Sequence, residues 1–236
     1  MLLASFRDTE LRLLHTITCE LRGRFADGLA DFVNDVVPGA AFFVLLFLLS
    51  AVTKRGRARF PRVVVTLLLA MGLVHGVREA IWRTMPRLRP GSTFEDEQIL
   101  SGPIARETCD AHPELWVERG YRPKSPSFPS SHVVTGGACA IALTYANPWL
   151  GAAAWLWAVL EGWGRLYWGK HWPSDIAGSL VLAVLLGMLA WRLAPRVLAD
   201  LSRRRRPPAA PPPPVPPGAH ASSTGDSSSD VGGASR

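Results

Sequence analysis

Three short polar segments of the chain carry residue types that can recognise and transfer a phosphoryl group. They read RTMPRLRP at 83–90, FPSSH at 128–132 and GRLYWGKHWPSD at 164–175. An arginine guanidinium donates paired hydrogen bonds to phosphate oxygens, and a histidine can act as nucleophile, acid or base. Each segment adjoins an apolar stretch, where ionisable side chains are costly and therefore suggest function. We interpret the three segments as parts of one site.

The apolar stretches that must position these segments are long enough to cross a lipid bilayer as helices. About twenty residues, each adding roughly 1.5 Å, span a hydrocarbon core about 30 Å thick. Stretches near this length occupy 36–52, 63–82, 132–146, 149–168 and 176–193. The sequence therefore predicts an all-α fold, a polytopic transmembrane helical bundle with five membrane helices.

Residues 1–35 precede the first membrane helix and have a different pattern. Apolar side chains such as Leu14, Ile17 and Leu21 recur at helical spacing among charged ones. This pattern is typical of an amphipathic helix at the membrane interface. The alternative is that this segment forms a sixth membrane helix. Residues 36–200 are then expected to form the transmembrane catalytic domain.

The distribution of positive charge predicts how the bundle is oriented. The formal net charge is +7, and basic residues gather in the connector 53–62 and at the start of the tail, 201–236. Because cytoplasmic loops carry an excess of Lys and Arg, we expect both in the cytoplasm and the polar segments on the opposite, exoplasmic side. Membrane topology thus accounts for the charge without a nucleic-acid partner. The composition of the tail, rich in Pro, Gly and Ser, predicts disorder.

The three cysteines, Cys19, Cys109 and Cys139, have neither CxxC spacing nor another metal-binding pattern. Their number cannot build a disulfide framework, so we interpret them as structural side chains. The sequence also shows no clustered carboxylates suited to Mg²⁺ and no His/Cys spacing typical of zinc. We therefore predict a site that uses no metal or other cofactor.

Together, the polar segments resemble the three-part signature of the type 2 phosphatidic acid phosphatase (PAP2) family, written KxxxxxxRP, PSGH and SRxxxxxHxxxD. The order of the parts and the long loop between the first two also agree. The matching residues are Arg89-Pro90, Pro129-Ser130-Ser131-His132, Arg165, His171 and Asp175. The resemblance implies a helical lipid phosphatase of the bacterial inner membrane, with its active site facing the periplasm.

By this resemblance, three residues carry out the chemistry. His171 is the expected nucleophile, which forms a phosphohistidine that water then hydrolyses. Asp175, one helical turn later, is expected to accept the proton on the other ring nitrogen and so fix the tautomer of His171. His132 is the expected acid that protonates the leaving oxygen and then the base that activates water.

The resemblance also implies which groups bind the phosphate. Arg89 and Arg165 are expected to hold its oxygens and to offset the charge of the transition state. Ser130 is expected to bind through its hydroxyl and Ser131 through its backbone amide, at a helix start where N–H groups and the helix dipole attract anions. Glu161, one turn before Arg165, either holds that arginine in position or only neutralises it.

Two positions depart from the signature. Trp82 stands where the first part has its lysine. Arg83 shares a helix face with His75 and Glu79 and is our choice for the missing cation. Gly164 stands where the third part begins with serine. The loss of one hydrogen bond to a charged group costs roughly 1.5–3 kcal/mol if nothing replaces it.

The expected substrate is a phosphorylated membrane lipid, such as phosphatidic acid, phosphatidylglycerol phosphate, undecaprenyl diphosphate or lipid A. One alternative is a lipid phosphotransferase, in which another alcohol accepts the phosphoryl group from the same histidine. A second alternative, suggested by the two departures, is a lipid-phosphate binder that lacks turnover. The sequence leaves the headgroup and the oligomeric state open.

Overall fold

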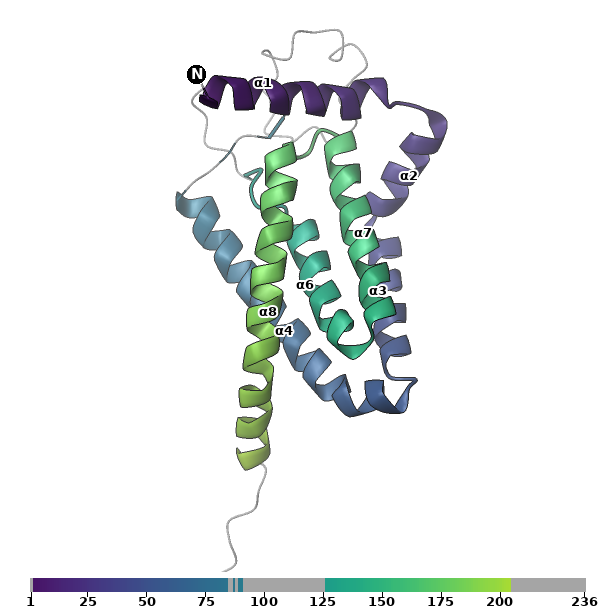
Figure 1. Ribbon diagram of the computed structural model, residues 1–236, viewed down its shortest axis with the longest axis vertical. Helices are drawn as coiled ribbons and strands as arrows, with labels where there is room; N and C mark the ends of the chain where they lie inside the picture. Colours follow the sequence, from purple (N-terminus) through teal and green to yellow (C-terminus); the bar gives the residue numbers. More distant parts are fainter. Residues whose placement is uncertain (1, 85–86, 88, 91–125, 205–236) are drawn as a thin grey trace, which may run out of the picture.

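A computed structural model of the chain describes residues 2–84, 87, 89–90 and 126–204 (Figure 1). Every regular element in these ranges is a helix, so the predicted all-α class is confirmed. The elements are α1 (Leu2–His15), the π-helical turn η1 (Thr16–Glu20), α2 (Arg24–Asn34), α3 (Val36–Ser50), α4 (Lys54–Thr84), α6 (Ser131–Ala146), α7 (Pro148–Tyr167) and α8 (Pro173–Arg204).

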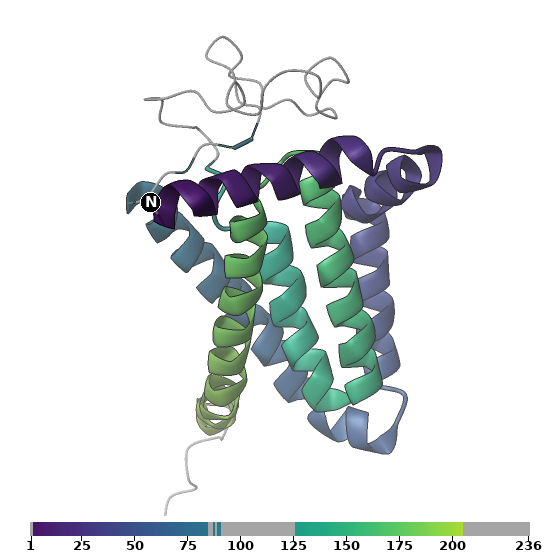
Figure 2. The same cartoon turned by 45° about the horizontal axis from the view of Figure 1, so that its top comes forward.

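The helix α6 lies at the centre of the bundle and packs against α3, α4, α7 and α8 (Figures 1 and 2). Its sequence is rich in glycine and alanine, and most of these residues are buried. An added Cβ at Gly137 would lie 2.7 Å from the Cβ of Ala183 on α8. Small residues therefore allow α6 and α8 to approach closely, as at helix interfaces in membranes.

Two described helices are long and apolar enough to cross a membrane, α8 and the part of α4 from Gly56 to Thr84. The pair α2 and α3, bent by 64° at their junction, meets the same criteria when taken together. The predicted stretches 132–146 and 149–168 do form helices, α6 and α7. Because α6 is enclosed by other helices and has only 16 residues, the count of five membrane helices stays a prediction.

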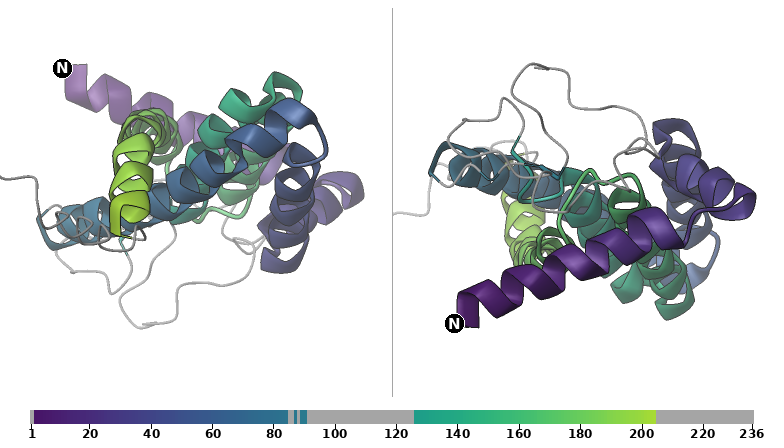
Figure 3. Two further views of the ribbon diagram at one scale, coloured as in Figure 1. Left: turned by 90° about the horizontal axis from the view of Figure 1, so that it is seen from below. Right: turned by 90° about the horizontal axis from the view of Figure 1, so that it is seen from above.

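The helix α1 runs across one end of the bundle (Figure 3, right). Leu14 is fully buried there in a cluster with Val133, Leu166, Trp172 and Ile176. Its neighbour Leu13 is 48% exposed, so α1 has one buried and one exposed side. Its location at a membrane surface stays a prediction.

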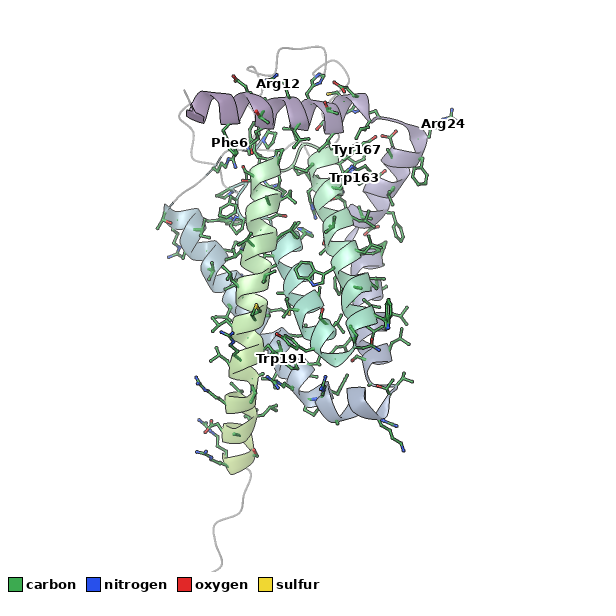
Figure 4. All side chains as sticks on the ribbon, in the orientation of Figure 1. Phe6, Arg12, Arg24, Trp163, Tyr167 and Trp191 are labelled. Carbon is green, nitrogen blue, oxygen red and sulfur yellow. The ribbon has the colours of Figure 1, made fainter. Side chains whose placement is uncertain are left out.

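The helix α2 covers one side of α7. Trp163 and Tyr167 of α7 lie between the two helices (Figure 4), and the buried ring of Tyr167 packs against Ala30. The helix α8 continues to Arg204, so it includes the first four residues of the segment 201–236 that was predicted to be a disordered tail. Residues 205–236 lie outside the described residues.

The interpretation of all three cysteines as simple structural side chains is wrong for Cys19, which is disulfide-bonded. Cys139 is free and lies half-buried on α6. Cys109 falls outside the described residues. Cys19 lies in η1, at the same end of the bundle as α1.

Candidate active site

The connector between α7 and α8 places His171 inside the protein. The helix α7 ends at Tyr167, and Gly169 has a φ of 61°, a left-handed conformation that suits glycine after a helix end. The backbone N–H of Lys170 then donates to the carbonyl of Arg165 at 2.9 Å. This tight reversal buries His171, whose exposed fraction is 3%.

The ring of His171 is oriented by a backbone carbonyl. Its Nδ1 lies 2.6 Å from the carbonyl oxygen of Ser127. A carbonyl can only accept, so Nδ1 carries the proton and Nε2 is left with its lone pair. Nε2 lies 3.5 Å from Nη1 of Arg89. This tautomer is the one that a nucleophilic Nε2 requires.

The expected direct hydrogen bond from His171 to Asp175 is not formed, because Nδ1 and Oδ2 of Asp175 are 3.9 Å apart. The carboxylate of Asp175 is fully buried and has other donors. It accepts from the hydroxyl of Ser127 and from the backbone N–H of Trp172 at 2.9 Å. It also forms an ion pair with Arg87 at 2.7 Å. Asp175 is thus connected to His171 through Ser127.

Burial and nearby positive charge keep His171 neutral. Burial first, and then the charges of Arg89 and Arg165, hold the pKa of His171 well below 6.5. The hydrogen bond to the backbone of Ser127 opposes this shift, and the charge of His132 adds to it. At neutral pH the imidazole is therefore unprotonated, which is the reactive state of a histidine nucleophile.

Two arginines from different parts of the chain lie close enough to His171 to influence its charge. Arg89 is held by the carbonyl of Lys170, to which its Nη1 donates at 3.0 Å. Burial, and then the charge of Arg165, lowers the pKa of Arg89 to about 10, so it stays charged at neutral pH. Arg165 comes from the last turn of α7 and is only 7% exposed. Its Nε–H is buried and donates to no partner among the described residues.

The start of α6 supplies further donors. Ser130 caps this helix and is fully buried. Its N–H donates to the hydroxyl of Ser179 at 2.8 Å, whereas its own Oγ is buried without a partner among the described residues. Buried polar atoms are nearly always paired. The unpaired Ser130 Oγ and Arg165 Nε therefore suggest that a polar ligand binds beside them. Ser131 and His132 occupy the first turn, with the side chain of His132 exposed.

The helix α4, which precedes the first polar segment, places Arg78 rather than Arg83 next to the start of α6. Arg78 donates to the hydroxyl of Ser131 at 3.1 Å and lies 3.0 Å from Nδ1 of His75. Its guanidinium also stacks over Trp82, 4.7 Å from the ring centroid. Arg83 instead pairs with Glu79 at 2.9 Å, and its side chain is 74% exposed. We therefore propose Arg78 in place of Arg83 as the cation of the first signature part.

Comparison with known proteins identifies the family. The sequence model of the PAP2 superfamily matches residues 62–199, more than half of the 236-residue chain. The chain belongs to the PAP2 superfamily. This match contains all three polar segments of the sequence, and the predicted family is confirmed.

Two curated relatives are similar over part of their length. Undecaprenyl-diphosphatase BcrC of Bacillus subtilis is 38% identical over 66 residues, which make up 28% of this chain and 34% of that protein. Lipid A 4'-phosphatase of Bacteroides thetaiotaomicron is 28% identical over 119 residues, 46% of this chain and 53% of that protein. The chain thus spans about a third to a half of these curated relatives.

Two solved structures are also similar. Aquifex aeolicus LpxE has a TM-score of 0.49 and 18% identity, and the alignment covers 77% of this chain and 94% of that one. A transmembrane PAP2-type phosphatidylglycerolphosphate phosphatase from Bacillus subtilis has a TM-score of 0.48 and 18% identity, with 86% and 90% covered.

The structure explains both departures from the PAP2 signature. A Cβ at Gly164 would lie 2.5 Å from Nδ2 of Asn34 and 2.8 Å from Cγ2 of Val33, so α2 occupies the space of the family's serine side chain. Arg78 lies one helical turn before Trp82, and residues four apart share a helix face. Arg78 thus brings a cation to the neighbourhood where the signature places lysine.

We expect Arg78→Met to lower kcat/KM roughly 10- to 100-fold, because a cation next to the phosphate would be lost. Arg83→Met is the matched control, and it should change kcat/KM by less than about twofold, as for other exposed surface charges. Phosphate release from a lipid phosphate measures both variants. A larger loss in the Arg83 variant would reverse the assignment.

Three residues that contact Asp175 directly or through one partner were not predicted from the sequence: Arg87, Ser127 and Glu10. Arg87 lies within the first polar segment and Ser127 directly precedes the second, so proximity to the motifs was an available signal. Glu10 binds Arg87 at 2.8 Å from a helix that is distant in sequence. No spacing rule connects these two positions.

Proposed function

We propose that this PAP2 protein is a membrane lipid phosphatase that works through a phosphohistidine at His171. The observation that supports this most strongly is a buried, neutral imidazole beside Arg89, with Arg165 and His132 close enough to influence its charge. The unpaired hydroxyl of Ser130 adds a donor for a phosphate oxygen. These groups suit an anionic phosphoryl group and a nucleophile for its phosphorus.

In the proposed reaction, Nε2 of His171 attacks phosphorus while the bond from phosphorus to the lipid oxygen breaks. His132 donates a proton to that leaving oxygen and then removes one from the water that attacks the phosphohistidine. Inorganic phosphate leaves and His171 is restored. The carbonyl of Ser127 holds the Nδ1 proton throughout, and Asp175 fixes Ser127.

Charge neutralisation in this proposal falls to the arginines Arg89, Arg165 and Arg78. Among the described residues, no group of three or more His, Cys, Asp or Glu side chains is arranged to hold a metal ion. We therefore propose that turnover needs no metal. Removal of metal by EDTA tests this point directly.

We further propose that the site faces the periplasm of a bacterial inner membrane. The basic start of α4 and the basic end of α8 lie toward the opposite end of the bundle from α1 (Figure 1). Excess positive charge favours the cytoplasm. The disulfide bond of Cys19, at the end where α1 lies, fits an oxidising compartment. A lipid tail would then stay in the bilayer while its phosphate reaches His171.

Phosphate release by detergent-purified protein in excess EDTA tests the proposed function. The panel contains phosphatidic acid, phosphatidylglycerol phosphate, undecaprenyl diphosphate and lipid A. The names of the curated relatives make undecaprenyl diphosphate and lipid A the first substrates to try. We expect metal-independent release from at least one lipid. Turnover only with an added alcohol acceptor would indicate a phosphotransferase, and no release from any lipid would contradict the proposal.

A further inference from the structure

Glu10 is a buried acid on a helix that the PAP2 match at residues 62–199 does not include. Its side chain is 7% exposed, although it belongs to the amphipathic α1 at the end of the bundle. Carboxylates are rarely buried to this extent unless they are paired. Its partners therefore indicate why it lies inside.

The first partner of Glu10 is the start of α8. One carboxylate oxygen accepts from the backbone N–H of Ser174 at 3.0 Å and from the hydroxyl of the same residue. The first N–H groups of a helix have no partner within the helix, and a negative charge there is favourable. Glu10 thus caps α8 from a segment that is 164 residues away in sequence.

The second partner is Arg87, which Glu10 shares with Asp175. Nη2 of Arg87 lies 2.8 Å from Oε2 of Glu10, and Nη1 lies 2.7 Å from Oδ1 of Asp175. Nη1 also donates to the hydroxyl of Ser174 at 2.6 Å. A planar guanidinium held at both ends has one orientation. Glu10 therefore fixes the cation that binds Asp175.

From Asp175 the contacts lead to the nucleophile. With Oδ1 bound to Arg87, Oδ2 accepts from the hydroxyl of Ser127 and the N–H of Trp172. The carbonyl of Ser127 then orients Nδ1 of His171. The fully buried Leu14, one turn after Glu10, anchors α1 against Trp172 and Ile176 in this same region.

We infer that Glu10 is a positioning residue for the nucleophile and acts through Arg87, Asp175 and Ser127. The helix α1 would then contribute to catalysis. This inference rests on the proposed function. The partners of Glu10, Ser174 and Arg87, are not among the groups expected to bind phosphate. The loss of Glu10 should therefore reduce kcat and leave KM nearly unchanged.

The kinetic test uses Glu10→Gln, which keeps the shape of the side chain and removes its charge. We expect kcat to fall roughly 10- to 100-fold, a size typical of small misplacements of catalytic groups, with KM changed less than about twofold. Asp8→Asn is the matched control, because it removes the same charge from an exposed position on α1. The control should behave like the wild type.

A double-mutant cycle with Arg87→Met separates positioning from a general effect on folding. If Glu10 acts through Arg87, the double variant should be no slower than Arg87→Met alone, because the second substitution removes nothing further. A merely structural role of Glu10 would instead multiply the two losses. Multiplied losses, or a Glu10→Gln variant with wild-type kcat, would overturn the inference.

Hydrogen exchange tests the contact without any need for activity. In Glu10→Ala, the amide of Ser174 should exchange at least about tenfold faster, as expected when a hydrogen bond is lost. Asp8→Ala should leave this rate unchanged. If the wild type released no phosphate from any lipid, the proposed function would fail. The exchange rate would still test whether Glu10 binds the amide of Ser174. An unchanged rate in Glu10→Ala would overturn the role of Glu10.

Discussion

Replacement of His171 by glutamine is expected to lower kcat for phosphate release by about ten-thousand-fold or more, because the covalent route would be closed. Glutamine has a similar length but no lone-pair nitrogen that can form a phosphoryl bond. The phosphate-binding groups Arg89, Arg165 and Ser130 remain, so binding of the lipid phosphate should persist. Initial rates with saturating lipid measure the loss.

The control for this variant is His15→Gln, a histidine at the end of α1 that pairs with Glu20 at 3.4 Å. It should keep wild-type kcat, because its ion pair is with Glu20 of η1 and not with a residue expected to act on phosphate. Substantial release by the His171 variant, within about a hundredfold of wild type, would be too fast for catalysis without the nucleophile. Such a rate would remove His171 from the proposed mechanism.

The second large effect is expected for Arg165→Met, which should reduce kcat/KM about a thousandfold. Arg165 is almost fully buried, and a charge that stabilises a phosphoryl transition state is worth most where water is excluded. Arg165→Lys should recover only part of the rate, because an ammonium group cannot reproduce the paired donors of a guanidinium. Measurement of kcat and KM for both variants tests the prediction.

Arg62→Met provides a matched control for Arg165→Met. Arg62 also has a buried Nε without a partner among the described residues, but its guanidinium lies over Trp191, 3.7 Å from the ring centroid. Compared at equal protein concentration, Arg62→Met should leave kcat/KM within about threefold of the wild type, because the Arg62 side chain packs against Trp191. Equal losses in the two variants would show a general effect of removing a buried arginine.

Much of the helical framework follows from apolar periodicity. The predicted stretches 36–52, 63–82 and 176–193 fall on α3, α4 and α8, because long apolar runs favour helices whichever solvent surrounds them. The helices α4 and α8 continue beyond these stretches into their basic ends. Hydropathy could not predict where these helices begin and end, because residues with good helix propensity continue a helix outside the apolar stretch.

The spacing of the third polar segment was informative because His171 and Asp175 are separated by one helical turn. It could not reveal that Asp175 reaches His171 through Ser127, because the acceptor on Ser127 is a backbone carbonyl that every residue type possesses. The contact from Glu10 to Ser174 was equally hidden. It depends on how α1 packs across the bundle, which local sequence does not specify.

The choice between Arg78 and Arg83 shows a related limit. The spacing argument favoured Arg83 because it shares a helix face with His75 and Glu79, although Arg78, four residues before Trp82, shares the face of Trp82. The structure separates them by their partners, Ser131 for Arg78 and Glu79 for Arg83. Gly164 is explained only by the side chains of α2 that fill the space beside it.

Mass spectrometry of protein quenched in alkali during turnover tests the proposed phosphohistidine most directly, since alkali preserves a bond between phosphorus and imidazole nitrogen. We expect a phosphoryl group on the peptide that contains His171 in the wild type and none in His171→Gln. His132→Ala should accumulate more of it, because hydrolysis of the intermediate loses its base. Continued turnover with no phosphoryl group on His171, or with the group on another residue, would contradict the mechanism.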